Sequence, residues 1–324
     1  AVIVASSGKL LAWIGNPQQE TFLRSSAKPF QVIPFIEQGY ARDLGLVPRE
    51  VAQLCASHTG TDMHVETIRG IQAKAGIEEH HLQCGTHPPI DEETKKRLIM
   101  QGENPTPIRH NCSGKHSGML AFAKLRGLPL DNYLSPQHPV QKDILKTISE
   151  MCLILPEKIG IGTDGCSAPN FSLPLYNAAL GFARLCDRHA LPQKRAETCQ
   201  IITSAMMAHP EMVSGFGRFD TRLMQVGRGK LIVKGGAEGY QAVGIMPDLT
   251  EASPKGVGIA LKISDGDPNE KVRAAVMLEI LRQFGVLNKS ELAELSEFGP
   301  VNAIYNWRKI KTGESRPVFE LSRA

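Results

Sequence analysis

Apolar and polar residues follow two different patterns along the chain. Two short apolar runs, 1–5 and 10–15, flank a polar break at 6–9, which predicts a strand, a turn and a second strand. After residue 214 the pattern again favours strands, interrupted by one helix at 269–285. The strands expected there lie at 230–234, 240–246, 256–263, 302–307 and 316–321.

Helical spacing dominates between these two parts. Residues 90–102 begin with acids, continue with bases and end at a glycine, the charge order that a helix dipole favours. Residues 172–187 and 192–210 carry apolar residues at helical spacing, with prolines near the ends. The prediction is an α/β (α+β) fold in one domain, 1–324. A mainly antiparallel sheet comes from 1–27 plus 214–324, is covered by helices, and has the helix-rich region 28–213 inserted.

Composition narrows the class of protein. With 42% apolar residues the chain builds a substantial core, and a net charge of +4 without basic runs argues against nucleic acid or an anionic membrane as partner. No apolar stretch approaches eighteen residues, and the start lacks the pattern of a signal peptide. Seven cysteines without a CxxC pair are typical of reduced thiols, so we expect a cytoplasmic protein. The chain starts without methionine inside an apolar run, so we expect natural residues before Ala1.

The first candidate chemistry is a serine three positions before a lysine, Ser25 and Lys28. A serine becomes a nucleophile when a base takes its proton, and a neutral lysine can be that base. The spacing alone is weak evidence, because 19 serines and 19 lysines in 324 residues give about one such match by chance, and Ser6 with Lys9 is a second. Pro29 biases Lys28 away from helical geometry, so the sequence leaves open whether Lys28 faces Ser25.

Serine acyl enzymes of this type also need a later lysine on a strand and a second hydroxyl. Lys234 ends an apolar strand and precedes glycines that admit a substrate close to the backbone, so we prefer it to Lys311, which begins a literal KTG in a charged, hairpin-like stretch. Ser57 ends the apolar run 51–56 and supplies the second hydroxyl. A capping role for Ser57 remains open.

Two glycine-containing polar loops carry one cysteine each. Cys112, Lys115 and His116 in the first loop, with Asp164 and Cys166 in the second, can gather around zinc. From residue types alone, two cysteines and His116 form the conventional ligand set, and two buried thiols at a loop junction are the alternative.

Seven segments together resemble the bacterial L-asparaginase II family of the rhizobial, thermolabile type, and they cover nearly the whole chain in order. The segments are FLRSSAKPFQ, CASHTG, HNCSGKHSGML, TDGCSAPNFSLPL, GRFDTRLM, KGGAEGYQAVGI and LKISDGD. The resemblance implies a serine β-lactamase-like and glutaminase-like fold, a homodimer, and hydrolysis of L-asparagine to L-aspartate and ammonia.

The resemblance also implies roles for single residues. It pairs Ser25 with Lys28 and Ser57 with Lys234 as two catalytic Ser-Lys pairs. It also implies that Cys112, Lys115 and Cys166 bind a zinc ion that assists substrate binding. The implied substrate-binding residues are Arg24, Asn111, His116 and Asp164. Ser167 stands where many relatives are expected to have glycine.

The resulting hypothesis is acyl transfer to a serine. Lys28, kept neutral by burial and by the charge of Lys234, activates Ser25, and Ser57 relays a proton; Ser57 with Lys234 as nucleophile pair stays open. The alternatives are a penicillin-recognising acyl enzyme or glutaminase, a metal-dependent amidohydrolase, and an amino-acid binding protein without catalysis.

Overall fold

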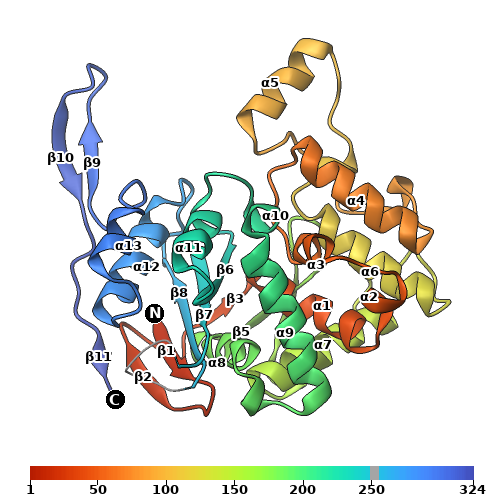
Figure 1. Ribbon diagram of the computed structural model, residues 1–324, viewed down its shortest axis with the longest axis horizontal. Coiled ribbons are helices and arrows are strands. Elements are labelled where there is room, and N and C mark those ends of the chain that lie inside the picture. Colours follow the sequence, from red (N-terminus) through yellow and green to blue (C-terminus); the bar gives the residue numbers. More distant parts are fainter. Residues whose placement is uncertain (249–254) are drawn as a thin grey trace.

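One side of the molecule is built on a six-stranded antiparallel sheet made from both ends of the chain (Figure 1). The computed structural model describes residues 1–248 and 255–324. The strand order is β11-β2-β1-β8-β7-β6, so the first strand of the chain pairs with one that follows some 250 residues later. The strands are β1 (Val2–Ala5), β2 (Leu10–Trp13), β6 (Leu231–Gly236), β7 (Tyr240–Ile245), β8 (Val257–Lys262) and β11 (Ser322–Arg323). The predicted fold class is confirmed.

Helix α8 (Leu175–Cys186) lies across the middle of this sheet and contacts β1, β7 and β8. The contact is so close that a Cβ at Gly258 would lie 1.8 Å from the carbonyl oxygen of Ala179. A glycine in β8 is therefore required for this packing. Helix α11 (Phe219–Gly227) packs on β6, and α12 (Lys271–Gln283) packs on β7 and β8.

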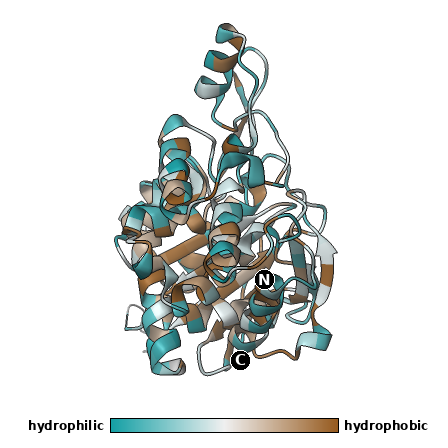
Figure 2. Cartoon of the chain, turned by 90° about the vertical axis from the view of Figure 1, so that its right-hand side faces the viewer, coloured by the Kyte–Doolittle hydropathy of each residue, from teal (hydrophilic) through white to brown (hydrophobic). Residues whose placement is uncertain are grey.

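The helical region lies beside the sheet, and apolar residues gather in its interior while polar residues face outward (Figure 2). Its predicted helices at 90–102, 172–187 and 192–210 are confirmed as α5, α8 and α9, and 269–285 is confirmed as α12. The other helices are α1 (Lys28–Glu37), α2 (Tyr40–Asp43), α3 (Pro48–Leu54), α4 (Asp62–Ala75), α5 (Glu92–Gln101), α6 (Ser113–Leu125), α7 (Pro139–Cys152), α9 (Gln193–Ala208), α10 (Pro210–Ser214) and α13 (Lys289–Ala293). None of the helices in 1–248 and 255–324 has the length and apolar character of a membrane span.

A small second sheet was not predicted. It has the order β3-β5-β4 and joins β3 (Glu20–Phe22) to β4 (Gly160–Thr163) and β5 (Pro169–Pro174). Two of these strands, β4 and β5, lie inside the range expected to be helix-rich. Three of the four residues of β4 are glycine or threonine, and β5 begins and ends with proline. Their strand conformation comes from pairing with distant segments and leaves little local signal.

Two elements project from the body: α5 and the hairpin of β9 (Asn302–Tyr305) and β10 (Lys311–Ser315) (Figure 1). The strand predicted at 316–321 is wrong, since β10 is instead the charged segment before it, and Val318 is 88% exposed. The register of the hairpin is set by its turn, where Ile310 N donates to the side chain of Asn306.

Candidate functional site

The site begins at a 3-10 helix, Arg24–Ala27, that runs into α1. Lys28 is the first residue of α1 and has α-helical angles (φ −58°, ψ −40°), although Pro29 follows it. Its N–H donates to the carbonyl oxygen of Ser25. Proline is tolerated in the first helical turn, so the local bias against the helix is overcome there.

Ser57 lies between two buried lysines. Lys28 Nζ is 2.8 Å from Ser57 Oγ, and Lys234 Nζ is 3.0 Å from the same oxygen. Lys28 also donates to the carbonyl oxygen of Ala56, and Lys234 to that of Gly235. Both lysines are 1% exposed. The two amino groups therefore meet at one hydroxyl, although their residues are 206 positions apart in sequence.

Burial, and after it the charge of Lys28, lower the pKa of Lys234 to about 7, while Asp220 partly opposes the shift. Lys234 thus has a pKa lowered toward neutrality, a property that the sequence did not predict for it. A lysine with a pKa near 7 is a competent general base at neutral pH.

Ser25 is half-buried, and no hydrogen bond joins its hydroxyl to Lys28 in the described part of the chain. The Ser25 and Lys28 pair thus stays a prediction. The neighbouring Ser26 has a structural contact, because its Oγ donates to the carbonyl oxygen of Lys234 at 2.6 Å and so ties the 3-10 helix to β6. Ser6 is likewise structural and donates to Asp187 at 2.5 Å.

Cys112, Asp164 and Cys166 form a second cluster, and their ligand atoms lie within 4.8 Å of one another. Lys115 Nζ is 3.0 Å from Cys166 Sγ. The hydrogen bond with Cys166 and the charges of Lys28 and Lys115 hold the pKa of Cys112 well below its usual range. Burial disfavours charge on Lys115, but Cys166, Cys112 and Asp164 outweigh it and raise the pKa of Lys115. The charge of Lys28 acts on Cys112 and so links this cluster electrostatically to the Ser57 cluster.

These side chains fit a soft or borderline divalent metal. Two cysteine sulfurs and a carboxylate are donors that zinc accepts, and the charge-stabilised thiolate is the form that binds metal. Lys115 can join them as a ligand once its ammonium has lost a proton, which a bound cation favours. His116 lies outside the compact group; its Nδ1 bonds Tyr133 Oη at 2.6 Å, and its buried Nε2 has no partner among the described residues. Ser167, beside Cys166, has φ +68°, a conformation that glycine adopts without strain.

Arg24 and Asn111 connect the two clusters to the rim of the site. Arg24 Nε donates to Asp164 Oδ1 at 2.6 Å, and the Arg24 guanidinium also pairs with Glu238 at 2.7 Å. Asn111 is held through its backbone, because His87 Nε2 accepts its N–H at 3.1 Å and its carbonyl oxygen accepts from His58 N at 3.2 Å. The predicted site residues thus fall in two adjacent clusters and their rim.

Lys311 lies apart from them, on the exposed β9–β10 hairpin, where it pairs with Glu314. The preference for Lys234 over Lys311 agrees with this placement.

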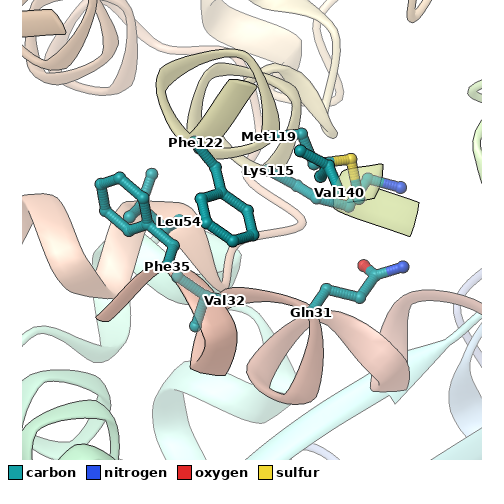
Figure 3. A pocket seen from close by; sticks show the side chains of 9 residues that line it. Gln31, Val32, Phe35, Leu54, Lys115, Met119, Phe122 and Val140 are labelled. Carbon is teal, nitrogen blue, oxygen red and sulfur yellow. The ribbon is translucent and has the colours of Figure 1, made fainter. Parts of the chain in front are cut away.

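Behind Lys115, α1 and α6 enclose a cavity of about 10 Å³ (Figure 3). Figure 3 shows the side chains of Gln31 and Lys115 at one end and Phe35, Leu54 and Phe122 at the other. Gln31 Oε1 is buried there and has no partner among the described residues. This volume admits at most one water molecule, so the substrate must bind elsewhere in the site.

Two supporting residues were missed by sequence reasoning. Asp220 at the start of α11 accepts from Gly235 N at 2.6 Å and from Gln241 Nε2 at 2.9 Å, which fixes the end of β6. Arg273 of α12, 6% exposed, donates to the carbonyl oxygen of Gly236. Asp220 lies in the quoted segment GRFDTRLM, which is a signal that it is functional; Arg273 lies in an ordinary amphipathic helix and offers none.

The sequence profile described as L-asparaginase II matches residues 1–317. No curated protein matches the chain. Among solved structures, a probable glutaminase from Bacillus subtilis complexed with 6-diazo-5-oxo-L-norleucine has 11% identity and a TM-score of 0.40, covering 88% of this chain and 84% of that one. A covalent complex of a Bacillus subtilis glutaminase with 5-oxo-L-norleucine has 12% identity and a TM-score of 0.40, covering 89% and 88%.

Proposed function

Because the chain belongs to the L-asparaginase II family, and is on that account an asparagine amidohydrolase, we propose that it acts through a serine acyl-enzyme. The observation that carries the proposal is the Ser57 hydroxyl held between Lys28 and Lys234. Two amino groups at one hydroxyl form a path along which a proton can leave one group and return to another.

In this mechanism Ser25 is the nucleophile. Its Oγ attacks the side-chain amide carbon of L-asparagine, and its proton passes through the Lys28, Ser57 and Lys234 group. The C–N bond then breaks, the nitrogen takes the proton back and leaves as ammonia, and a β-aspartyl ester remains. A water molecule attacks this ester with the same proton path and releases L-aspartate. Catalytic hydrogen bonds often tighten only when substrate binds, which is the step expected to bring Ser25 into the network.

The position of Ser25 supports this role. Its N–H lies in the first turn of a helix, where N–H groups have no acceptor within the helix and can stabilise an oxyanion. Both lysines already donate to Ser57, so the Ser57 hydroxyl is free to donate its own proton. A relay needs such a hydroxyl.

A second assignment makes Ser57 the nucleophile and Lys234 its base. The distance of 3.0 Å and the pKa of Lys234 near 7 favour it. Ammonia release by the Ser25 and Ser57 variants, together with mapping of a trapped adduct, separates the two assignments.

Substrate recognition falls to Arg24, Asn111, His116 and Asp164. Zinc, when bound by Cys112, Lys115 and Cys166, supplies an electrophilic centre that holds a charged or polar end of the substrate. Fixing the charged ends at one distance from the nucleophile favours asparagine over glutamine, because one additional methylene displaces the amide carbon.

The test is ammonia release from L-asparagine and L-glutamine by wild type, Ser25→Ala and Ser57→Ala, with the exposed Ser7→Ala as control. We expect loss in the first two variants and wild-type activity in the control. Intact mass of an adduct formed with a diazo-ketone analogue of the substrate, followed by peptide mapping, locates the nucleophile. Full activity of Ser25→Ala, or an adduct on Ser57, would overturn the Ser25 assignment; no ammonia from wild type would overturn the function.

We infer a cytoplasmic homodimer from the same family resemblance. The fully exposed Trp307 and the 59% exposed Tyr305 on the β9–β10 hairpin are apolar surface that an association would cover. Sedimentation of wild type and Trp307→Glu tests this: we expect a dimer that the substitution weakens, and a monomeric wild type would contradict it.

A further inference from the structure

The turn between β6 and β7 brings an exposed carboxylate onto an arginine of the site. We propose that Glu238 is a specificity-determining residue that occupies, on Arg24, the place of the substrate α-carboxylate and is displaced by it. This inference rests on the proposed function, in which Arg24 binds substrate.

Arg24 has two carboxylate partners of different character. Asp164 accepts from Arg24 Nε at 2.6 Å and its side chain is 11% exposed, whereas Glu238 Oε1 lies 2.7 Å from Arg24 Nη1 and its side chain is 66% exposed. The buried pair fixes the guanidinium. The exposed pair is screened by water and exchanges at low cost.

The backbone holds Glu238 at this position against its own preference. Glu238 has φ +61°, a conformation that glycine adopts more readily than glutamate. Gly236 permits the close approach of the turn, because a Cβ there would lie 2.8 Å from the carbonyl oxygen of Leu23 and 3.3 Å from Arg24 Cβ. Arg273 Nη1 fixes the other side through the carbonyl oxygens of Gly236 and Tyr240. A strained glutamate beside a site residue points to a role for its side chain.

The chemistry of guanidinium binding explains that role. Asp164 uses the Nε side of Arg24, so the edge formed by Nη1 and Nη2 remains for a second carboxylate. The substrate α-carboxylate can bind this edge with two parallel hydrogen bonds and must first displace Glu238. An amide without an α-carboxylate does not compete for this edge, so Glu238 changes the affinity of amino acids alone.

Glu238→Gln removes the competing charge at constant size. Because exposed ion pairs are weak, we expect KM for L-asparagine to fall about two- to fivefold with kcat unchanged. Glu294→Gln is the matched control, since Glu294 forms an exposed ion pair at 2.8 Å with Arg228, away from the site. Arg228, like Arg24, has a positive φ. The KM of Glu294→Gln should equal that of wild type.

Two further measurements secure the result. Glu238→Gly relieves the backbone strain, so it folds at least as well and should lower KM by the same factor. By calorimetry, both Glu238 variants should bind L-aspartate two- to fivefold more tightly, with no gain for β-alaninamide, which lacks the α-carboxylate. An unchanged or raised KM in both variants, or an equal gain for β-alaninamide, would overturn the inference. Absence of ammonia release by wild type would overturn the proposed function instead, and the L-aspartate titration still tests Glu238.

Discussion

Lys234→Met should make the protein inactive and more stable. Folding lowers the pKa of Lys234 from 10.5 to about 7, chiefly because the amine is buried. At about 1.4 kcal/mol per pKa unit, keeping this lysine charged in the folded protein costs roughly 5 kcal/mol relative to the unfolded chain. Methionine fills similar space without a charge and forfeits two hydrogen bonds, so we expect a net gain of several kcal/mol below pH 7.

The sign of the pH dependence follows from proton binding. Below about pH 7 both states hold the proton, and the full cost is present. Between about 7 and 10.5 only the unfolded state holds it, so stability of the wild type rises with pH by about 1.4 kcal/mol per unit. From pH 6 to 9 the advantage of the variant should therefore shrink by roughly 2 to 3 kcal/mol.

Urea unfolding of wild type and Lys234→Met, followed by circular dichroism at pH 6, 7, 8 and 9, measures this difference. Lys96→Met, at an exposed lysine, is the control, and its free energy of unfolding should equal that of wild type at every pH. Ammonia release should fall at least about a hundredfold in Lys234→Met, as for a lost general base. A variant that is less stable than wild type at pH 6, or a stability difference independent of pH, would refute the assignment of a low pKa to Lys234.

Three further outcomes follow from the same contacts. Gly236→Ala should lower stability by about 1–3 kcal/mol in denaturant unfolding and reduce ammonia release, because its Cβ would meet the carbonyl oxygen of Leu23 at 2.8 Å; wild-type values would contradict that contact. Asp220 raises the pKa of Lys234, so Asp220→Asn should move the rising limb of the pH–activity profile, expected near 7 in wild type, to lower pH, and a shift upward would contradict the base role of Lys234. Cys112→Ser should abolish zinc binding, measured by elemental analysis after dialysis, with far-ultraviolet circular dichroism unchanged; retained stoichiometric zinc would contradict the ligand set.

Much of the fold was predictable because its signals are local. Strands β1, β2, β6, β7 and β8 are short apolar runs bounded by polar or glycine breaks, and α5 shows its charge order and its terminal glycine. The three-stranded sheet and β10 were missed because their strand conformation depends on a partner distant in sequence or on a turn, and their own residues are small, charged or bounded by proline.

The site divides in the same way. Residue types revealed the serines, lysines and thiols, but only the packing of β6 against the 3-10 helix decides that both lysines reach Ser57. The lowered pKa of Lys234 depends on its burial and on the nearby charge of Lys28, and neither can be derived from the spacing of Ser25 and Lys28. Nothing in the sequence pointed to a role for Glu238, because only its contact with Arg24 in the folded protein places it at the site.

The pairing of β1 with β8 has a consequence for folding during synthesis on the ribosome. The strand that pairs with β1 is translated some 250 residues later, and Ser57 contacts both Lys28 and Lys234 only after Lys234 has been translated. Contacts of such long sequence separation form slowly, and a nascent chain that ends before β6 contains Ser25, Ser57 and both thiols but not the second lysine. We therefore expect hydrolysis of asparagine to begin only after the C-terminal third has been synthesised and docked.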